Sequence, residues 1–285
     1  MPARARADRL QTAYLKACRL ELRALKPGNV HIFAAGHGMT VAMFEASASA
    51  SSGPIARLGA TVGERILEAV SATAAAVGCN TNLGIVLLAA PLLAAAERAA
   101  PRPGLRPALD AVLADLTIDD AAQAFAAIRL AKPAGLGAVP AQDVAAAPTL
   151  DLRAAMRLAA SRDLIARQYE DGFAEIFDIG LVLLPAAPRE WDVTLTYLDF
   201  LSRFPDSHVM RKFGEDVAAR LCEEAQNLSR RVRQIGEGAA AQALLADFDR
   251  ALKERGVNPG TSADLTVASL LARACTSIVE GEGPT

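Results

Sequence analysis

Residues 83–96, with the sequence LGIVLLAAPLLAAA, form the one continuous apolar run of this chain, and they decide its fold. The run is shorter than the roughly 18 residues that a membrane-spanning helix needs, and it contains Pro91. Because the run is apolar on every side, a helix formed by it must have other helices packed all around it. The run therefore predicts a buried helix at the centre of a helical bundle.

The rest of the sequence also favours helices. Of the 285 residues, 52% are hydrophobic, mostly Ala and Leu, whereas only 5% are aromatic and long β-branched runs are missing. Apolar residues recur at helical spacing until Pro or Gly interrupts the pattern. The pattern predicts helices over 6–25, 40–51, 56–77, 82–98, 106–130 (with a break), 150–178 (with a break), 188–203, 207–234, 238–255 and 262–280.

We therefore expect an all-α fold, a multi-helix bundle around a buried central helix. A single domain over residues 1–285 is preferred, because polar segments from both halves of the chain need to meet for the chemistry described below. Residues 131–148 are rich in Pro, Gly and Ala, and they predict a flexible loop.

Composition also excludes several classes of protein. The 30 Lys and Arg residues balance 32 Asp and Glu residues without a long block of one sign, so no nucleic-acid partner is expected. The start, MPARARADRLQ, lacks the apolar stretch of a secretory signal, so we expect a cytoplasmic protein without a membrane partner. A homodimer is left open. Four distant cysteines, without a C-x-x-C pair, predict small buried thiols: Cys18, Cys79, Cys222 and Cys275.

Four short polar segments interrupt the apolar helices, each at a predicted helix end. Helix N-termini present unpaired N–H groups and a partial positive charge, so the last three segments suit phosphate binding. Lys26, Arg211 and Lys212 could add full charges there. The segments are 26–31 (KPGNVH), 79–84 (CNTNLG), 205–214 (PDSHVMRKFG) and 258–265 (NPGTSADL).

Each segment also has an ordinary structural interpretation. Thr261 and Asp264 have the spacing of a capping box, and Asp206 or Ser207 is a good N-cap after a proline. Lys-Pro-Gly ends a helix, and residues 80–82 could cap the buried helix. Taken singly, the segments leave capping and ligand binding both open.

Taken together, in this order and spacing, the segments resemble the triphosphoribosyl-dephospho-coenzyme A synthase family. That family has Lys-Pro-Gly after a helical Glu, then Gly-x-Asn-Thr-x-x-Gly, then Asp-[Thr/Ser] leading to a basic residue and Gly, and finally Asn-Pro-Gly-x-Ser-Ala-Asp-Leu. The last segment is the most specific, and the resemblance covers roughly residues 21–269. The matching positions are Glu21, 26–28, Gly78, Asn80, Thr81, Gly84, Asp206, Ser207, Arg211, Gly214, 258–260 and 262–265.

The resemblance implies an all-helical transferase that joins ATP to 3′-dephospho-coenzyme A and releases adenine. It implies an acidic pocket in which Mg²⁺ helps to hold the triphosphate. The implied catalytic residues are Glu21, Asp206 and Asp264, of which Asp206 and Asp264 would also bind the metal. The implied substrate-binding residues are Lys26, Gly28, Asn29, His31, Asn80, Thr81, Asn82, Ser207, Arg211, Lys212, Asn258, Gly260 and Ser262.

Some positions depart from the family pattern. Asn82 stands where the coenzyme-making members have His, and the segment from His37 to Thr40 lacks the two acids that follow His in those members. One alternative is therefore a divergent member with a different phosphorylated substrate, in the biosynthesis of a one-carbon carrier coenzyme of the tetrahydromethanopterin or methanofuran type. A second alternative is a non-catalytic helical assembly factor. The acids and bases kept at converging helix ends favour an enzyme.

Overall fold

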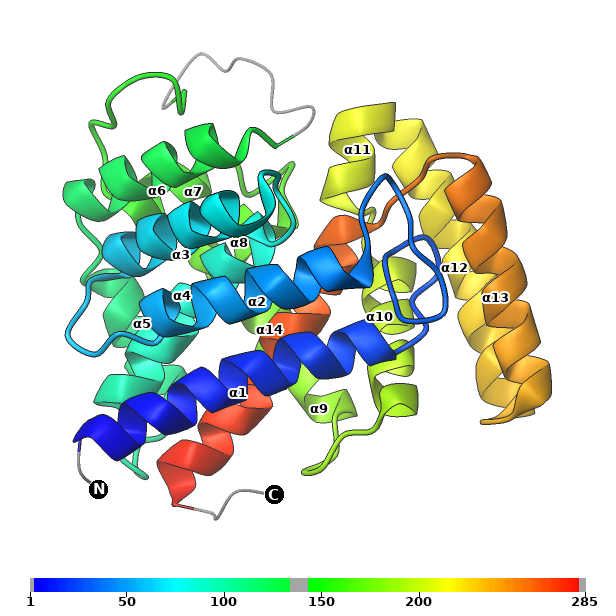
Figure 1. The fold of residues 1–285 in the computed structure, drawn as a ribbon, viewed down its shortest axis with the longest axis horizontal. Helices are drawn as coiled ribbons and strands as arrows, with labels where there is room; N and C mark the ends of the chain where they lie inside the picture. Colours follow the sequence, from blue (N-terminus) through cyan, green and yellow to red (C-terminus); the bar gives the residue numbers. More distant parts are fainter. Residues whose placement is uncertain (1–2, 134–142, 282–285) are drawn as a thin grey trace.

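The computed structural model of the chain describes residues 3–133 and 143–281, and within them the fold is all-α (Figure 1). The described residues contain no β-strand, only two isolated bridges in the loop that follows the first helix. The predicted fold class is therefore confirmed. The elements are α1 (Ala3–Arg23), α2 (Val41–Ile55), α3 (Val62–Val77), α4 (Leu83–Arg98), α5 (Leu105–Ala114), α6 (Ile118–Ala131), α7 (Leu152–Arg157), α8 (Leu164–Asp171), the π-helical turn η1 (Ile176–Gly180), α9 (Leu181–Leu183), α10 (Glu190–Arg203), α11 (Ser207–Phe213), α12 (Glu215–Ile235), α13 (Ala239–Glu254) and α14 (Gly260–Glu280).

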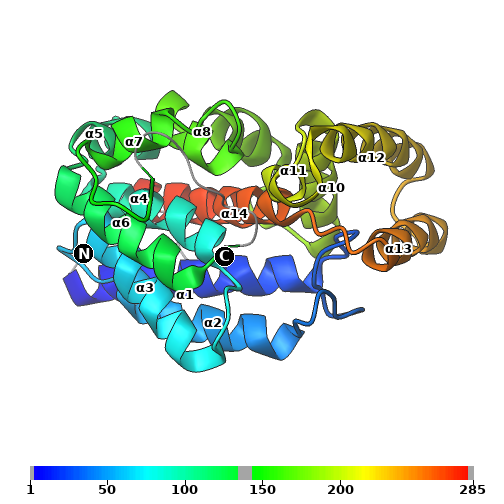
Figure 2. The same cartoon turned by 90° about the horizontal axis from the view of Figure 1, so that it is seen from above.

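Two helices, α4 and α14, share the centre of the bundle. Every residue of α4 from Ile85 to Ala96 is buried, as the apolar run predicts. In Figure 2, α14 lies between a layer formed by α1, α2 and α3 and a layer that contains α5 and α8. By length and composition α14 is the one described helix that could cross a membrane, and 67% of its apolar window is buried in the protein. Here it is a core helix, surrounded by others.

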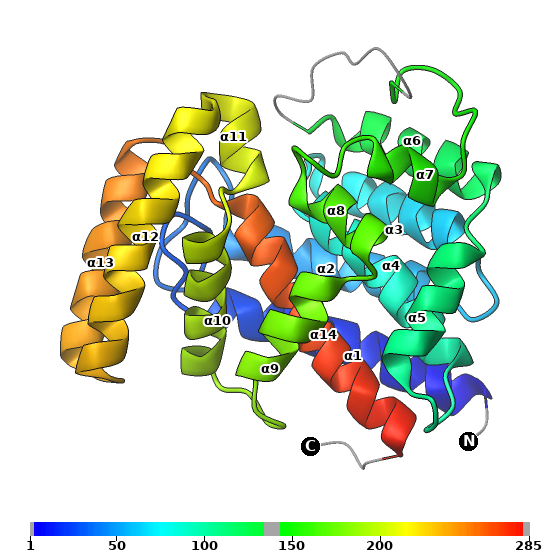
Figure 3. The same ribbon diagram turned by 180° about the vertical axis from the view of Figure 1, so that it is seen from behind.

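A second apolar cluster holds α10, α11, α12 and α13 together. Its centre consists of buried residues such as Tyr197, Leu221 and Leu245, and Trp191 packs against its edge. Figure 3 shows α12 and α13 side by side at the outer edge of the molecule. This position leaves α13 next to the loop that connects α1 with α2.

Helix boundaries differ from the prediction where capping or glycine decides them. The third helix begins at Val62 rather than near residue 56, because Thr61 and Glu64 form a capping box. The helix predicted over 207–234 is divided at Gly214, whose φ of +91° is not helical. In the predicted loop 131–148, residues 134–142 lie outside the described residues. Three of the four cysteines are buried as expected, but Cys79 is exposed.

Candidate active site

A cavity of about 540 Å³ opens beside the two central helices. Its size is that of a small-molecule site. One part of the wall is polar and comes from the four sequence segments and their neighbours; the other is apolar and comes mainly from α4, α6, α7 and α8. The polar wall contains Glu21, Asn29, Asn80, Thr81, Asn82, Asp163, His208, Arg211, Asn258, Gly260 and Asp264, and the apolar wall contains Phe44, Leu87, Phe125, Ile128, Met156 and Ile165.

The structure separates the residues assigned from the sequence into two groups. Glu21, Asn29, Asn80, Thr81, Asn82, Arg211, Asn258, Gly260 and Asp264 line the cavity. The remaining ones do not line it: Lys26, Gly28, His31, Asp206, Ser207, Lys212 and Ser262. The second group supports the first, with the exception of Lys212, which is exposed and lies 5.0 Å from the ring centre of Phe213.

Asp264 faces the cavity without a hydrogen-bond donor among the described residues. The capping box expected at Thr261 and Asp264 is absent, because α14 begins at Gly260 and Thr261 instead accepts a hydrogen bond from the N–H of His208 at 3.1 Å. Burial, followed by the nearby carboxylates of Asp206 and Glu21, raises the pKa of Asp264 well above its ordinary value. The capping interpretation of Asp264 is therefore wrong.

The carboxyl group of Asp264 packs directly on Gly84 in the first turn of α4. A methyl group added at Gly84 would lie 2.5 Å from Asp264 Cγ and 2.8 Å from Ile165 Cδ1, closer than real side chains approach. Glycine is the worst helix former apart from proline, so its presence here needs a reason of this kind. Gly84 provides the space in which the carboxyl group of Asp264 lies.

Replacing Gly84 with alanine is expected to displace the Asp264 side chain. We expect at least a tenfold loss of nucleotide affinity, together with a stability cost of about 1–3 kcal/mol from overpacking. Gly53 is the matched control, because it is an exposed helical glycine in α2 whose added methyl group would meet no atom closer than 4.0 Å. Calorimetric titration and thermal melting of both variants test this. Equal affinity in Gly84→Ala and Gly53→Ala would show that the position of Asp264 is not fixed by Gly84.

Asp206 has a different role from the predicted one. It is the N-cap of α11, where Oδ1 accepts hydrogen bonds from the N–H groups of His208 (3.0 Å) and Val209 (3.1 Å). Its Oδ2 accepts from both the N–H and the hydroxyl of Ser262, each at 2.8 Å. These four bonds fill the acceptor positions of the carboxylate. Asp206 was assigned above to catalysis and metal binding. In the structure its buried carboxylate instead links the N-terminus of α11 to that of α14.

Lys26 is also fully engaged inside the protein. Its ammonium group donates to Glu21 Oε1 at 2.5 Å, to the Val30 carbonyl at 2.8 Å and to Asn29 Oδ1 at 3.3 Å. All three protons are used, so Lys26 does not serve as the phosphate ligand that the sequence suggests. Burial raises the pKa of Glu21 and lowers that of Lys26, and the attraction between the two opposes both shifts. Lys26 therefore stabilises an ionised Glu21 at the cavity wall.

Arg211 provides the cationic side of the cavity. One guanidinium nitrogen, Nη1, donates to Asp163 Oδ2 at 2.5 Å, and Asp163 in turn caps α8. The Nε–H of Arg211 is buried and has no partner in the part of the chain that the structure describes. An unsatisfied buried donor of this kind is costly, and the guanidinium charge of Arg211 at the cavity wall suits an anionic group. His208 lies on the same wall, where burial lowers its pKa and favours the neutral ring.

The turn before α4 is held by its own side chains. Asn80 Oδ1 accepts from the N–H of Leu83 at 3.1 Å, whereas Asn82, the N-cap by position, makes no capping bond. Thr81 shares a 2.5 Å hydrogen bond with Ser47, and the Asn82 amide donates to Ser51 at 3.2 Å. The turn is thereby fixed against α2, and the first turn of α4 lies at the cavity wall.

The donor set fits a substrate-bound Mg²⁺ better than a metal held by protein alone. Among the described residues there is no group of three or more His, Cys, Asp and Glu placed to hold a metal ion. However, Mg²⁺ commonly binds through one or two carboxylates together with substrate phosphates and water. Asp264 has its carboxyl group on the cavity and no donor from residues 3–133 or 143–281, and it suits that role.

Comparisons with known proteins identify the family and the fold of this chain. The family model described as ATP:dephospho-CoA triphosphoribosyl transferase (CitG) matches residues 7–282. A crystal structure of an Archaeoglobus fulgidus protein, described as a candidate triphosphoribosyl-dephospho-CoA synthase, superposes with a TM-score of 0.63. It is 24% identical, and the match covers 83% of this chain and 98% of the other. It shows the shared fold. No curated protein sequence matches this chain.

Proposed function

The chain belongs to the ATP:dephospho-CoA triphosphoribosyl transferase family, and we propose that it carries out its transfer in the cavity between Glu21, Arg211 and Asp264. Membership of this family makes it a transferase of coenzyme biosynthesis. The observation that carries the proposal is the pair of cavity carboxyl groups with different surroundings, since Glu21 forms an ion pair with buried Lys26, whereas Asp264 forms no ion pair among the described residues.

The reaction replaces adenine on the ribose of ATP with a hydroxyl oxygen of the acceptor. The bond from the anomeric carbon to the adenine nitrogen breaks, and a bond from that carbon to the acceptor oxygen forms. The transition state resembles an oxocarbenium ion, as in glycoside chemistry. We assign Glu21 as the base that receives the hydroxyl proton, because Lys26 favours its ionised form at the cavity wall. Adenine carries a proton away, so the overall reaction is balanced.

The triphosphate belongs at the end of the cavity near Arg211. The guanidinium group of Arg211 and the N-terminal turn of α4 both line the cavity, and both are suited to anionic oxygens. The described wall nevertheless carries more acids than bases, which does not suit a triphosphate alone. The acids are Glu21, Asp143, Asp163 and Asp264, and the bases are Arg162 and Arg211. Bound Mg²⁺ would offset this charge, with Asp264 as its protein ligand.

The proposal is tested by the products formed from ATP and dephospho-CoA. We expect free adenine and a product heavier than dephospho-CoA by one triphosphoribosyl group, detected by chromatography and mass spectrometry. Because the cavity acids require a counter-ion, excess EDTA is expected to abolish the reaction and added MgCl₂ to restore it. Equal rates with and without EDTA would remove the metal from the account, and absence of adenine with every acceptor tested would contradict the function.

One observation favours a different acceptor. Asn82 lies on the cavity wall where the coenzyme-making members have His, and its amide is held by Ser51. A change at this position alters the hydrogen bonds that the cavity can make to an acceptor substrate. It leaves unchanged the end of the cavity near Arg211, where we place the triphosphate of ATP. Adenine release that is slow with dephospho-CoA and fast with precursors of a one-carbon carrier coenzyme would identify this second function.

A further inference from the structure

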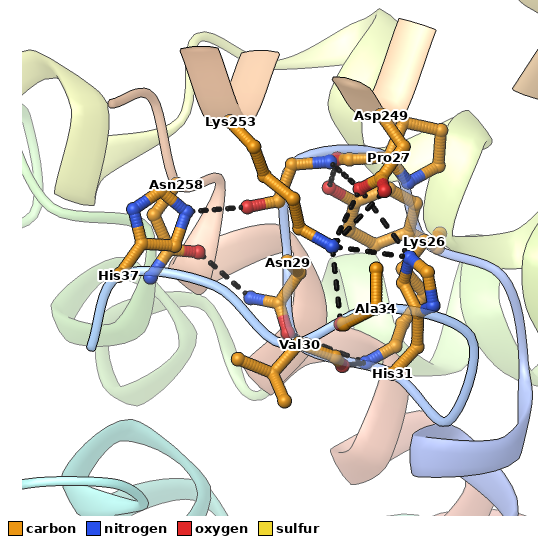
Figure 4. A network of polar contacts seen from close by, with 12 residues as sticks. Lys26, Pro27, Asn29, Val30, His31, Ala34, His37, Asp249, Lys253 and Asn258 are labelled. Carbon is orange, nitrogen blue, oxygen red and sulfur yellow. Dashed lines mark hydrogen bonds and ion pairs between the residues drawn. The ribbon is translucent and has the colours of Figure 1, made fainter. Parts of the chain in front are cut away.

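We propose that Asp249 and Lys253 on α13 are positioning residues for the cavity, and that they act on substrate binding through the loop that carries Gly28 and Asn29. Neither residue lines the cavity. Figure 4 shows both side chains reaching from α13 toward this loop. The inference rests on the proposed function, because it uses binding of the nucleotide as its readout.

Asp249 holds the loop by its backbone. Its Oδ1 accepts a hydrogen bond from the N–H of Gly28 at 2.8 Å and lies 3.3 Å from His31 Nε2. Its Oδ2 accepts from Lys253 at 3.0 Å, and the same ammonium group donates to the Ala34 carbonyl at 3.2 Å. The two side chains thus fix both ends of the segment from Gly28 to Ala34 (Figure 4).

These contacts differ from an ordinary ion pair one turn apart on a helix. Such pairs usually lie on the surface and contribute little to stability. Here the side chains of Asp249 and Lys253 are only 7% and 14% exposed, and they face the loop. Burial acts to raise the pKa of Asp249, but hydrogen bonds from His31, Lys253 and the Gly28 N–H together hold it below its ordinary value. The carboxylate therefore stays ionised as an acceptor for the loop.

Gly28 allows the loop to come this close. Its φ of +83° is in the left-handed region, and a methyl group added to it would lie 2.8 Å from Pro259 Cδ and 2.9 Å from Leu252 Cδ1. The backbone at this point is thus enclosed by α13 and by the turn before α14. Two further bonds hold it there, from the Tyr197 hydroxyl to the Pro27 carbonyl at 2.7 Å and between His37 Nε2 and the Gly28 carbonyl at 2.8 Å.

Asn29 connects this arrangement to the cavity. It follows Gly28 directly, lines the cavity, and donates its amide to Asn258 Oδ1 at 2.9 Å. Its Oδ1 accepts from Lys26, the partner of Glu21. A shift of Gly28 therefore moves Asn29 and disturbs two other cavity residues, Asn258 and Glu21, without touching the substrate itself.

The test is a double-mutant cycle on the affinity for ATP in the presence of MgCl₂, measured by calorimetry. We expect Asp249→Asn to weaken binding about tenfold, because the amide replaces one acceptor oxygen with a donor. In an Asn29→Ala background the same change is expected to cost less than about twofold, since its route to the substrate is already lost. In an Arg211→Gln background the full tenfold effect should remain. Asp247→Asn is the matched control, because Asp247 lies on α13 and pairs with Arg250 on the exposed side of the helix, where both side chains are 66% exposed.

Each outcome bears on a different claim. A wild-type chain that does not bind ATP with Mg²⁺ would overturn the proposed function and this inference with it. Wild-type binding with equal effects of Asp249→Asn in all three backgrounds would overturn only the positioning role. If Asp249→Asn does not fold, Lys253→Met takes its place, with a smaller expected loss of about threefold and the same dependence on Asn29. A lower melting temperature with unchanged affinity would show that α13 only supports the fold.

Discussion

Replacing Asp264 with asparagine is expected to abolish turnover and to leave the fold intact. The carboxyl group has no donor among the described residues, so asparagine removes no hydrogen bond and keeps nearly the same volume on Gly84. The change removes a cavity acid that has no donor among the described residues and that we assign to Mg²⁺ with the triphosphate. We expect a loss of at least about a hundredfold in kcat/KM, the size typical of losing a metal ligand or its support.

The same variant makes a prediction about stability and pH. Below the pKa of an unfolded aspartate, about 4, Asp264 is neutral in both states and its contribution to stability is complete. As the pH rises through the raised pKa of the folded state, the buried group must ionise, and that stability is lost. Asparagine stays neutral. In thermal melts in metal-free buffer between pH 5 and 8, the melting temperature of Asp264→Asn should therefore increase relative to that of the wild type as the pH rises. A variant that melts lower and turns over normally would restore the capping role.

Replacing Asp206 with alanine is expected to produce the opposite result. The change leaves the buried N–H groups of Val209 and Ser262 and the Ser262 hydroxyl without this acceptor, and the N–H of His208 keeps only its bond to Thr261. We expect a loss of about 3 kcal/mol or more in the free energy of unfolding, measured with urea. Asp151→Ala is the matched control, because Asp151 caps α7 with a single bond to Ala154 and should cost about 1 kcal/mol. Equal losses in the two variants would show that Asp206 does not join the helices.

Much of the fold follows from the sequence because the helices are strongly periodic and their ends carry clear signals. Residues 83–96 predict α4 as a buried helix, since none of these fourteen residues has a polar side chain. The sequence did not show that α14 shares the centre, because its buried faces include Ser262, Thr266 and Ser269, whose hydroxyls bond within the protein. Small polar residues of this kind are compatible with either a surface or a core.

The two aspartates show why site residues are harder to assign than helices. Asp206 and Asp264 both follow a proline near a helix start, so local sequence gives them the same two interpretations. The outcome depends on where α14 begins. Because it begins at Gly260, Thr261 and Asp264 lie inside the helix, and Asp206 from another helix accepts from its N-terminus instead. Only the packing of α11 against α14 decides this.

The roles of other residues around the site cannot be predicted from the sequence next to them. Asp249 and Lys253 have the spacing of a surface ion pair, and nothing in the sequence shows that a loop more than two hundred residues earlier folds against them. Likewise, the sequence alone shows Gly84 only as a residue of low helix propensity. The structure shows that the carboxyl group of Asp264 packs on it. Contacts between distant segments create these roles.

The most direct test of the account is a single-turnover measurement of adenine release from ATP with dephospho-CoA and MgCl₂. Wild-type protein in excess over ATP should release one adenine per ATP, whereas Asp264→Asn, which we expect to melt no lower than the wild type, should release none on the same timescale. Adenine release by Asp264→Asn at the wild-type rate would contradict the claim that the transfer takes place in the cavity at Asp264.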